Sequence, residues 1–275
     1  MLNQWDCLLK NLGAWHGSFT RYSPEGREIE DIPTLVSLEA RNNGKSIHQI
    51  VRRFPPAEEP NDLVLDYSEL NDSILFFPDG TFSQGAKQWG RYFNFGGEFG
   101  LINGDRRLRL VQLYNQTGKF DRFVLIREKL NQPPTNYQPD LSIEQLIGEW
   151  QGTVTTISRD FQLTSLESYL KITQAGDNLM QQLTFGHSNN LKQISSTAKI
   201  KGNQLLFEQG DLPVQILLLP DGASCNCPLE IRYGFPFVLE MGWLISPTQR
   251  QRIIRSFNAK GEWLNCTLVK ETKVI

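Results

Sequence analysis

Short runs of alternating apolar and polar residues occur throughout the chain, and this alternation indicates β-strands. In the first half such runs lie at residues 37–41, 46–54 and 120–126. In the second half they lie at residues 170–173, 181–185, 199–201, 205–208 and 265–269. Dipeptides that favour tight turns separate the runs of the first half, namely Asn43-Gly44, Asp79-Gly80, Asn103-Gly104 and Thr117-Gly118.

Strands that follow one another roughly every eight to twelve residues, with no long helix between them, predict an antiparallel β-barrel or β-sandwich. A unit of ~130 residues with about eight strands favours a closed barrel, since closure removes exposed strand edges. The pattern of apolar and polar residues therefore predicts an all-β protein built from antiparallel barrels.

The two halves of the chain share three sequence patterns in the same order, which indicates a tandem duplication. The first is apolar-Gly-x-Trp-x-Gly-(Ser/Thr)-apolar-Thr, at residues 12–20 and 147–155. The second is apolar-Pro-Asp-Gly, at residues 77–80 and 219–222, and the third spans residues 114–120 and 257–263. Corresponding positions are separated by 135, 142 and 143 residues, a drift that loop insertions explain. We therefore predict two tandem barrels.

A polar segment with three prolines, residues 131–140, lies between the two copies and predicts a semi-rigid linker. We place the boundary at about residue 138, which gives domains 1–138 and 139–275. Each copy is expected to begin with a short helix, over residues 4–12 and 141–147, the second capped by Asp140 or Ser142.

Composition excludes several classes of function. The 275 residues contain 28 Lys and Arg against 30 Asp and Glu, and this near balance does not favour nucleic acid or anionic membranes as partners. No apolar run approaches the ~18 residues of a membrane-spanning helix, and the first residues lack the features of a secretory signal. Four cysteines are too few for a disulfide framework in a chain of this length. We expect a soluble, cytoplasmic protein.

The Gly-x-Trp segments, Gly13-Ala14-Trp15 and Gly148-Glu149-Trp150, each follow a predicted short helix. In this the chain resembles the lipocalins and the wider calycin group, whose eight-stranded barrels hold small apolar ligands. More closely, it resembles a largely cyanobacterial family of double calycin-like proteins of unknown function, distantly similar to the S-type bilin lyases that attach chromophores to phycobiliproteins. The resemblance extends over essentially the whole chain and implies two lipocalin-like barrels, without implying an activity.

Trp15 and Trp150 are predicted to be structural plugs. Glycine lets the chain turn from the helix into the first strand, and the large indole then closes one end of the barrel. The ring can also accept a cation from a neighbouring strand. We favour this role over direct contact with a ligand.

Motifs of common catalytic sites are absent from the sequence. The three histidines, His16, His48 and His187, lack zinc-site spacing, so no metal site is expected. There is no phosphate-binding loop and no Gly-x-Ser-x-Gly motif. Cys225 and Cys227 could share one face of a strand as a redox pair or a transient thioether site, but no nearby group is expected to lower a thiol pKa, and we favour inert thiols. An enzymatic role is therefore less favoured than a binding role, and no cofactor is firmly indicated.

One acid and one arginine recur in both copies and are the candidate ligand-binding residues. Glu98 corresponds to Glu240, and Arg109 corresponds to Arg252. Arg109 shares a strand face with apolar neighbours, so an inward-pointing guanidinium could hold the carboxylate of a fatty acid or tetrapyrrole. The alternative is an Arg–Glu pair on the barrel exterior or across its rim.

Trp89 and Trp243 lie on segments upstream of these arginines. They either line the same barrel mouth as additional ligand contacts or pack in the protein interior.

Three functions remain open at the level of sequence. The leading one is a non-catalytic carrier or sensor that binds a small apolar, acidic ligand in a barrel cavity. The second is a bilin lyase-like factor that transfers a bilin to a phycobiliprotein. The third is a protein-interaction scaffold whose barrels are filled by side chains.

Overall fold

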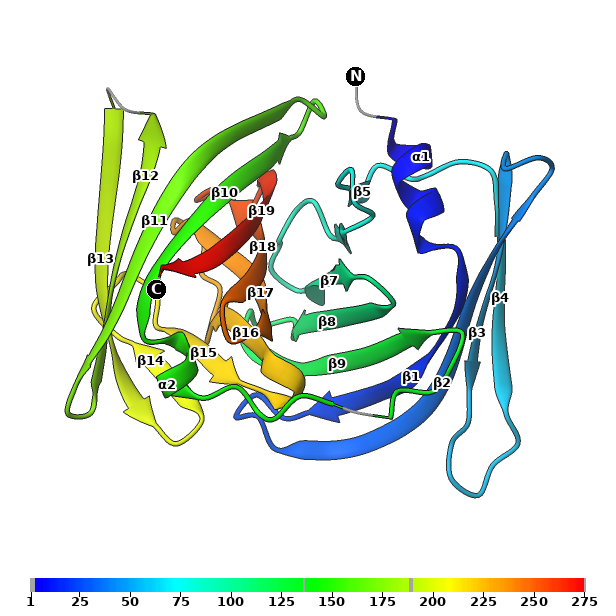
Figure 1. Cartoon of the computed structure of the whole chain (residues 1–275), viewed down its shortest axis with the longest axis horizontal. Coiled ribbons are helices and arrows are strands. Elements are labelled where there is room, and N and C mark those ends of the chain that lie inside the picture. The colour runs from blue at the N-terminus through cyan, green and yellow to red at the C-terminus, as the bar shows by residue number, and fades with distance from the viewer. Residues whose placement is uncertain (1–2, 136, 188–189, 275) are drawn as a thin grey trace. The chain divides into compact units, whose positions relative to one another are not determined.

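A computed structural model describes residues 3–135, 137–187 and 190–274. The described chain is nearly all β-structure, with short helices before each copy (Figure 1). It divides into two compact units. Unit 1 contains Met1–Gly85, Gly96–Leu113 and Arg122–Tyr137, and unit 2 contains Ala86–Phe95, Tyr114–Asp121 and Gln138–Ile275. Two short segments of the first copy therefore belong to unit 2, and the domain boundary near residue 138 stays a prediction.

The first copy forms one curled antiparallel sheet. It is preceded by α1 (Gln4–Leu8) and the 3-10 turn η1 (Leu9–Asn11). The strands are β1 (Gly13–Tyr22), β2 (Glu28–Arg41), β3 (Ser46–Arg53), β4 (Asn61–Tyr67), β5 (Ile74–Phe76), β6 (Phe82–Gly85), β7 (Phe95–Asn103), β8 (Arg106–Tyr114) and β9 (Phe120–Leu130). Their order is β4-β3-β2-β1-β9-β8-β7-β6-β5, so β4 and β5 are the two edges among the described residues.

The second copy forms a closed barrel of ten described strands, in sequence order. It follows α2 (Ile143–Leu146), and a 3-10 turn η2 (Pro220–Gly222) interrupts it. The strands are β10 (Gly148–Ser158), β11 (Leu163–Ala175), β12 (Asn178–His187), β13 (Asn190–Lys201), β14 (Gln204–Phe207), β15 (Val214–Leu218), β16 (Ala223–Pro228), β17 (Phe237–Ser246), β18 (Gln249–Phe257) and β19 (Trp263–Val274).

The predicted all-β fold with a short helix before each copy is confirmed, and the two copies differ in closure. In the barrel, the two residues Gly202-Asn203 join β13 to β14, and such a short turn holds consecutive strands side by side. In the first sheet, six residues separate the end of β4 from the start of the three-residue β5. These two strands do not pair, and the sheet stays open between them.

The two tryptophans of the Gly-x-Trp segments are buried at equivalent places. Trp15 and Trp150 are 1% and 0% exposed, and each belongs to a large apolar cluster of its own unit. Their indole nitrogens donate to the preceding turn or helix, to the carbonyl oxygens of Asn11 at 2.8 Å and Leu146 at 2.9 Å. The tryptophan therefore joins the short helical segment to the first strand of each copy.

The first glycine of each motif makes the turn into the strand. Gly13 and Gly148 have φ of 122° and 129°, a region that residues with a Cβ atom rarely adopt.

Among the described residues, no helix has the length and apolar character that a membrane span requires.

Candidate functional site

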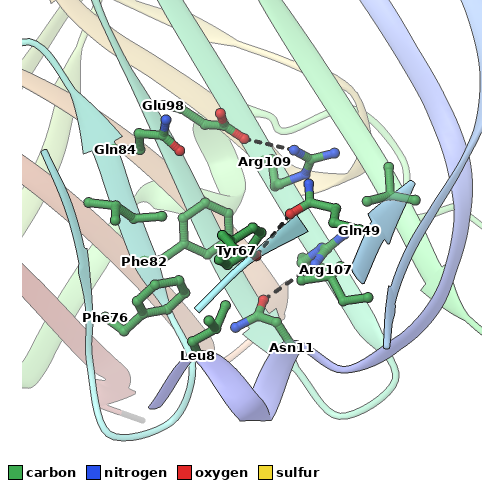
Figure 2. Close-up of a pocket in the computed structure, with 13 residues that line it drawn as sticks. Leu8, Asn11, Gln49, Tyr67, Phe76, Phe82, Gln84, Glu98, Arg107 and Arg109 are labelled. Atoms are coloured by element: carbon green, nitrogen blue, oxygen red, sulfur yellow. Dashed lines mark hydrogen bonds and ion pairs between the residues drawn. The ribbon is translucent and has the colours of Figure 1, made fainter. Parts of the chain in front are cut away.

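A buried cluster of two arginines and two glutamates lies inside unit 1. The arginines Arg107 and Arg109 share one face of β8 because strand side chains alternate. Glu98 and Glu128 reach them from the neighbouring strands β7 and β9. Arg109 bridges the two acids, with Nη1 2.7 Å from Glu98 and Nη2 2.8 Å from Glu128 (Figure 2 shows the pair with Glu98). Arg107 Nε donates to Glu128 at 2.7 Å and Nη1 donates to Asn11 at 3.3 Å.

Unit 2 repeats this cluster on the corresponding strands β17, β18 and β19. Arg252 bridges two acids, with Nη1 3.1 Å from Glu240 and Nη2 3.0 Å from Glu271. Arg250 Nε donates to Glu271 at 2.7 Å. The two clusters thus have the same four members in the same roles.

A cation lies over the buried tryptophan of each motif, as the sequence predicted. The guanidinium carbon of Arg107 is 4.3 Å from the centre of a Trp15 ring, and that of Arg250 is 4.7 Å from Trp150. These contacts have the geometry of cation–π interactions. In each unit the tryptophan of the Gly-x-Trp motif therefore contacts one arginine of the cluster.

The second glycine of the repeated motif makes room for the buried glutamate. Gly17 pairs with Glu128 across β1 and β9, and Gly152 pairs with Glu271 across β10 and β19. A Cβ atom at Gly152 would lie 2.7 Å from the Cγ atom of Glu271. At Gly17 it would lie 2.9 Å from Glu128 Cγ and would collide with the carbonyl oxygen of Arg127. The motif Gly-x-Trp-x-Gly thus encodes a turn, a buried tryptophan and a space for a carboxylate.

Both inner carboxylates remain charged in the folded protein. Burial by itself raises the pKa of Glu128, but the charges and hydrogen bonds of Arg107 and Arg109 lower the pKa to about 2. The same balance with Arg250 and Arg252 brings the pKa of Glu271 to about 2. Each glutamate is therefore ionised at neutral pH.

The two clusters differ in charge. In unit 1, two arginines face two glutamates. In unit 2, Lys273 adds a further cation: its Nζ lies 5.2 Å from the Trp150 ring and donates to the carbonyl oxygen of Gln145 at 3.0 Å. Burial, followed by the charge of Arg250, lowers the pKa of Lys273. The corresponding position in the first copy is Leu130, so only the second cluster has this additional basic group.

Each cluster forms part of the wall of a cavity within its own unit. The cavity of unit 1 measures about 110 Å³ and includes Glu98, Arg107 and Arg109 in its lining (Figure 2). Polar groups face it from other strands as well, and the hydroxyl of Tyr67 donates to Gln49 Oε1 at 3.0 Å. Most of the remaining lining is apolar: Leu8, Val36, Leu38, Ile74, Phe76 and Phe82.

The cavity of unit 2 is larger, at about 200 Å³, and includes Glu240, Arg250 and Arg252 in its lining. One guanidinium nitrogen of Arg250, Nη2, is buried without a hydrogen-bond partner among the described groups. In its counterpart Arg107, Nη2 donates to Glu128 at 3.1 Å, and Nε and Nη1 donate to Glu128 and Asn11. Pockets for drug-sized ligands usually measure about 300–1,000 Å³, so both cavities are small.

The structure brings together four of the six predicted ligand-binding residues. Arg109 lies with Glu98 in one cavity wall, and Arg252 lies with Glu240 in the other. Each arginine faces a cavity and is paired with glutamate there, in the interior of its unit and not on the barrel exterior. Binding of a ligand carboxylate by these arginines stays a prediction.

Trp89 and Trp243 are not among the residues that line these two cavities. Both are buried, at 3% and 1% exposure, and Trp243 Nε1 donates to the carbonyl oxygen of Asp221 at 3.1 Å. Trp243 thus packs in the interior, whereas Trp89 also lines a separate cavity of unit 2, of about 530 Å³, together with Arg232 and Tyr233. A ligand-contact role for either tryptophan stays a prediction.

Sequence reasoning missed half of each cluster: Arg107 and Glu128, and their counterparts Arg250 and Glu271. The signal was present, because both pairs are separated by 143 residues, the offset of the third shared pattern. Extending that offset along the final strands identifies all four.

The other candidates gave no site of their own. Cys225 and Cys227 are both 0% exposed on β16. No group of three or more His, Cys, Asp or Glu residues in the described chain is arranged to hold a metal ion.

Comparison with protein families gives two matches that together span nearly the whole chain. Residues 1–133 match the N-terminal domain of unknown function DUF3598. Residues 137–274 match the C-terminal domain of "Biogenesis factor required for ATP synthase 1". A search of curated proteins gave no significant match.

Two solved structures are similar to the chain to very different degrees. A protein of unknown function from the DUF3598 family of Nostoc punctiforme is 42% identical over 100% of both chains, with a TM-score of 0.93. The S-type phycobiliprotein lyase CpeS from Guillardia theta is 14% identical, with a TM-score of 0.41, over 48% of this chain and 90% of its own.

Proposed function

Since the chain belongs to the DUF3598 family, we propose that it is a non-catalytic protein-binding factor that acts in the biogenesis of ATP synthase. The observation that carries the proposal is the match of residues 137–274 to the C-terminal domain of a biogenesis factor required for ATP synthase. This is the scaffold function among the three that the sequence left open.

The buried clusters support a scaffold because their charged groups are engaged in holding strands together. In unit 1, Arg109 joins β7, β8 and β9 through two carboxylates. A general acid or base needs a pKa near the working pH, whereas Glu128 and Glu271 have pKa values of about 2. Such groups stabilise a rigid frame, and a rigid frame suits presentation of an outer surface to a partner.

Binding to isolated ATP synthase subunits tests the proposal. The full chain is titrated with each purified subunit of its host's ATP synthase, by biolayer interferometry, with bovine serum albumin as the unrelated control. We expect at least one subunit to bind with a Kd of micromolar or below. The proposal fails if no subunit binds at tens of micromolar.

A second candidate function is the binding of a small ligand with a hydrogen-bond acceptor in the cavity of unit 2. The observation that favours it is the buried Nη2 of Arg250, an arginine that lines this cavity. A carboxylate at Arg252 itself would have to displace Glu240, since Arg252 already holds two acids. A short acid suits the volume of about 200 Å³.

A fatty acid with a long chain or a bilin would need more space than this cavity provides. The bilin lyase-like function, with a phycobiliprotein as its partner, would therefore require this barrel cavity to open if the bilin bound there. We infer that the ligand, if one binds, is a short apolar acid.

Calorimetric titration with octanoate tests the second candidate, with 1-octanol as the neutral analogue and a free bilin as the bulky acid. Arg250→Gln should weaken octanoate binding by about ten- to a hundredfold, the loss of one charge-assisted hydrogen bond, and leave 1-octanol binding unchanged. Arg107→Gln is the matched control, because it alters the equivalent arginine of unit 1. The ligand function fails if wild type does not bind octanoate at millimolar concentration, or if both variants bind it equally. Binding of the bilin with a change in its visible absorption would favour the lyase-like function instead.

A further inference from the structure

The strand β4 forms an unpaired edge of the first sheet. It pairs with β3 on one side, and no strand of the described chain pairs with its other side. Its residues 61–66 are all exposed. In an antiparallel pair, alternate residues direct their N–H and C=O groups away from the partner strand, so β4 presents a row of such groups to solvent.

The β4 edge carries exposed apolar side chains, whereas most edge strands carry residues that prevent pairing with a further strand. Leu63, Val64 and Leu65 are 52%, 49% and 40% exposed, so apolar groups are accessible on both faces. Protected edges usually carry lysine, proline or a bulge at such places. The charges of β4 are limited to Asp62 and Asp66, which pair with Arg52 and His48 of β3.

The second copy shows what occupies the same place when the sheet is closed. By order along the chain, β13 corresponds to β4, since each is the fourth strand of its copy. β13 pairs with β12 on one side and with β14 on the other, where Ile200 lies opposite Leu205. Leu205 and Leu206 of β14 are buried, at 1% and 7% exposure. A short apolar strand therefore completes the barrel in the second copy.

The charge around β4 indicates the chemistry of a partner. Residues 54–73 contain six acidic residues and no lysine or arginine. Four of the acids lie in the segments that flank the strand, namely Glu58, Glu59, Glu69 and Asp72. A bound strand would therefore be favoured by basic residues at its ends, because opposite charges attract across an interface.

We propose that β4 is a docking edge, at which an extended apolar segment with flanking Lys or Arg residues, from a partner protein, adds a further strand to the first sheet. This mode of recognition uses backbone hydrogen bonds for affinity and side chains for specificity. The inference rests on the proposed function for the identity of the partner, which would be an ATP synthase subunit.

A synthetic peptide tests the edge without any assumption about ATP synthase. The probe is the peptide Lys-Lys-Thr-Val-Ile-Val-Thr-Lys-Lys, and its binding to the full chain is followed by hydrogen–deuterium exchange and fluorescence anisotropy. We expect amide exchange in residues 61–67 to slow at least tenfold. A peptide with proline at the central position and one with glutamate in place of the lysines should each bind at least tenfold more weakly.

The double variant Leu63→Lys with Leu65→Lys tests the side chains of the edge. Both residues are exposed, so the fold should persist, which circular dichroism checks. The variant should bind the lysine peptide at least tenfold more weakly. Leu264→Lys is the matched control, because Leu264 is 41% exposed on a strand of the other copy, and it should bind as wild type. The proposal is overturned if the peptide leaves exchange in residues 61–67 unchanged, or if both variants bind equally.

The same exchange measurement with purified ATP synthase subunits separates the two proposals. Slowed exchange in residues 61–67 on subunit binding supports both. Subunit binding that slows exchange only elsewhere overturns the docking edge and leaves the proposed function standing. Peptide docking at β4 without any subunit binding supports the edge and overturns the proposed function.

Discussion

The two copies in this chain keep the same buried charges but differ in how their strands close. Both hold a tryptophan, two arginines and two glutamates in matching contacts. The second copy closes into a barrel with the larger cavity and an additional lysine, whereas the first leaves β4 as an apolar edge. The comparison teaches that the cluster does not depend on barrel closure, since it stabilises three adjacent strands in either setting. The copies differ away from the cluster, where β4 and β5 remain unpaired and β13 and β14 pair.

Removal of the inner glutamate should give the largest effect. Glu271→Ala and Glu128→Ala each leave two buried arginines without their shared partner, and we expect a loss of about 3–5 kcal/mol in the free energy of unfolding of the affected unit. The two losses should be similar, because each glutamate has the same two arginine partners. Urea denaturation monitored by hydrogen exchange reports each unit separately.

The control for this prediction is Glu149→Ala, which removes an exposed pair with Lys171 and should cost at most about 1 kcal/mol. Losses of that small size at Glu128 or Glu271 would contradict a shared structural role for the clusters.

Replacing the buried tryptophans should give the next largest loss in the free energy of unfolding. Trp15→Ala and Trp150→Ala remove buried indoles that fill the core and receive an arginine, and each should cost about 3–5 kcal/mol. Trp→Phe at the same positions keeps an aromatic ring and loses the hydrogen bond to the preceding carbonyl oxygen, so its cost should be smaller. Chemical denaturation checks both, and a loss below about 1 kcal/mol for either Ala variant would rule out the plug role.

Acid should weaken both copies through the same groups. Glu128 and Glu271 have folded pKa values of about 2 against an ordinary 4.5, so the unfolded chain binds more protons between these pH values. Their stabilisation, about 3 kcal/mol for each group, is fully present above about pH 4.5 and is lost as pH falls towards 2. Stability measured from pH 7 to pH 3 should therefore decline below pH 5. Glu271→Gln should reduce that decline in unit 2 alone, and an unchanged slope would contradict the assignment.

Replacing Gly17 or Gly152, which make room for the carboxylates, should cost less stability, and the two costs should differ. Gly17→Ala should cost about 1–3 kcal/mol, because the added methyl group meets the backbone at Arg127. Gly152→Ala should cost less, since its nearest obstacle is the Glu271 side chain. Gly210→Ala is the control, with its nearest neighbour at 3.7 Å. Thermal unfolding ranks the three, and a Gly152→Ala cost equal to or above that of Gly17→Ala would contradict the comparison.

The sequence predicted the repeated and local features better than the long-range ones. Trp15 and Trp150, the two helices and the Arg109–Glu98 and Arg252–Glu240 correspondences follow from patterns that recur in both copies. Glu128 and Glu271 were missed because each lies on the final strand of its copy, far in sequence from the motif that makes room for it.

Closure could not be predicted in the same way. It depends on whether β4 pairs with β5 and β13 with β14, which packing across the whole sheet decides. The length of the connection does not decide it, because β14 and β15 also lie six residues apart and do pair. The alternation of apolar and polar residues along a strand is the same whether or not that strand pairs with the next one. Cavity volume likewise depends on the packing of side chains from many strands.

The proposed role in ATP synthase biogenesis is tested by the amount of assembled ATP synthase in the host organism. The gene is deleted and then restored as wild type or as the Leu264→Lys control, and the assembled complex is quantified by native gel electrophoresis at constant transcript level. We predict that the deletion lowers the amount of assembled complex severalfold and that both restored genes recover it. An unchanged amount of assembled complex in the deletion strain would contradict the account.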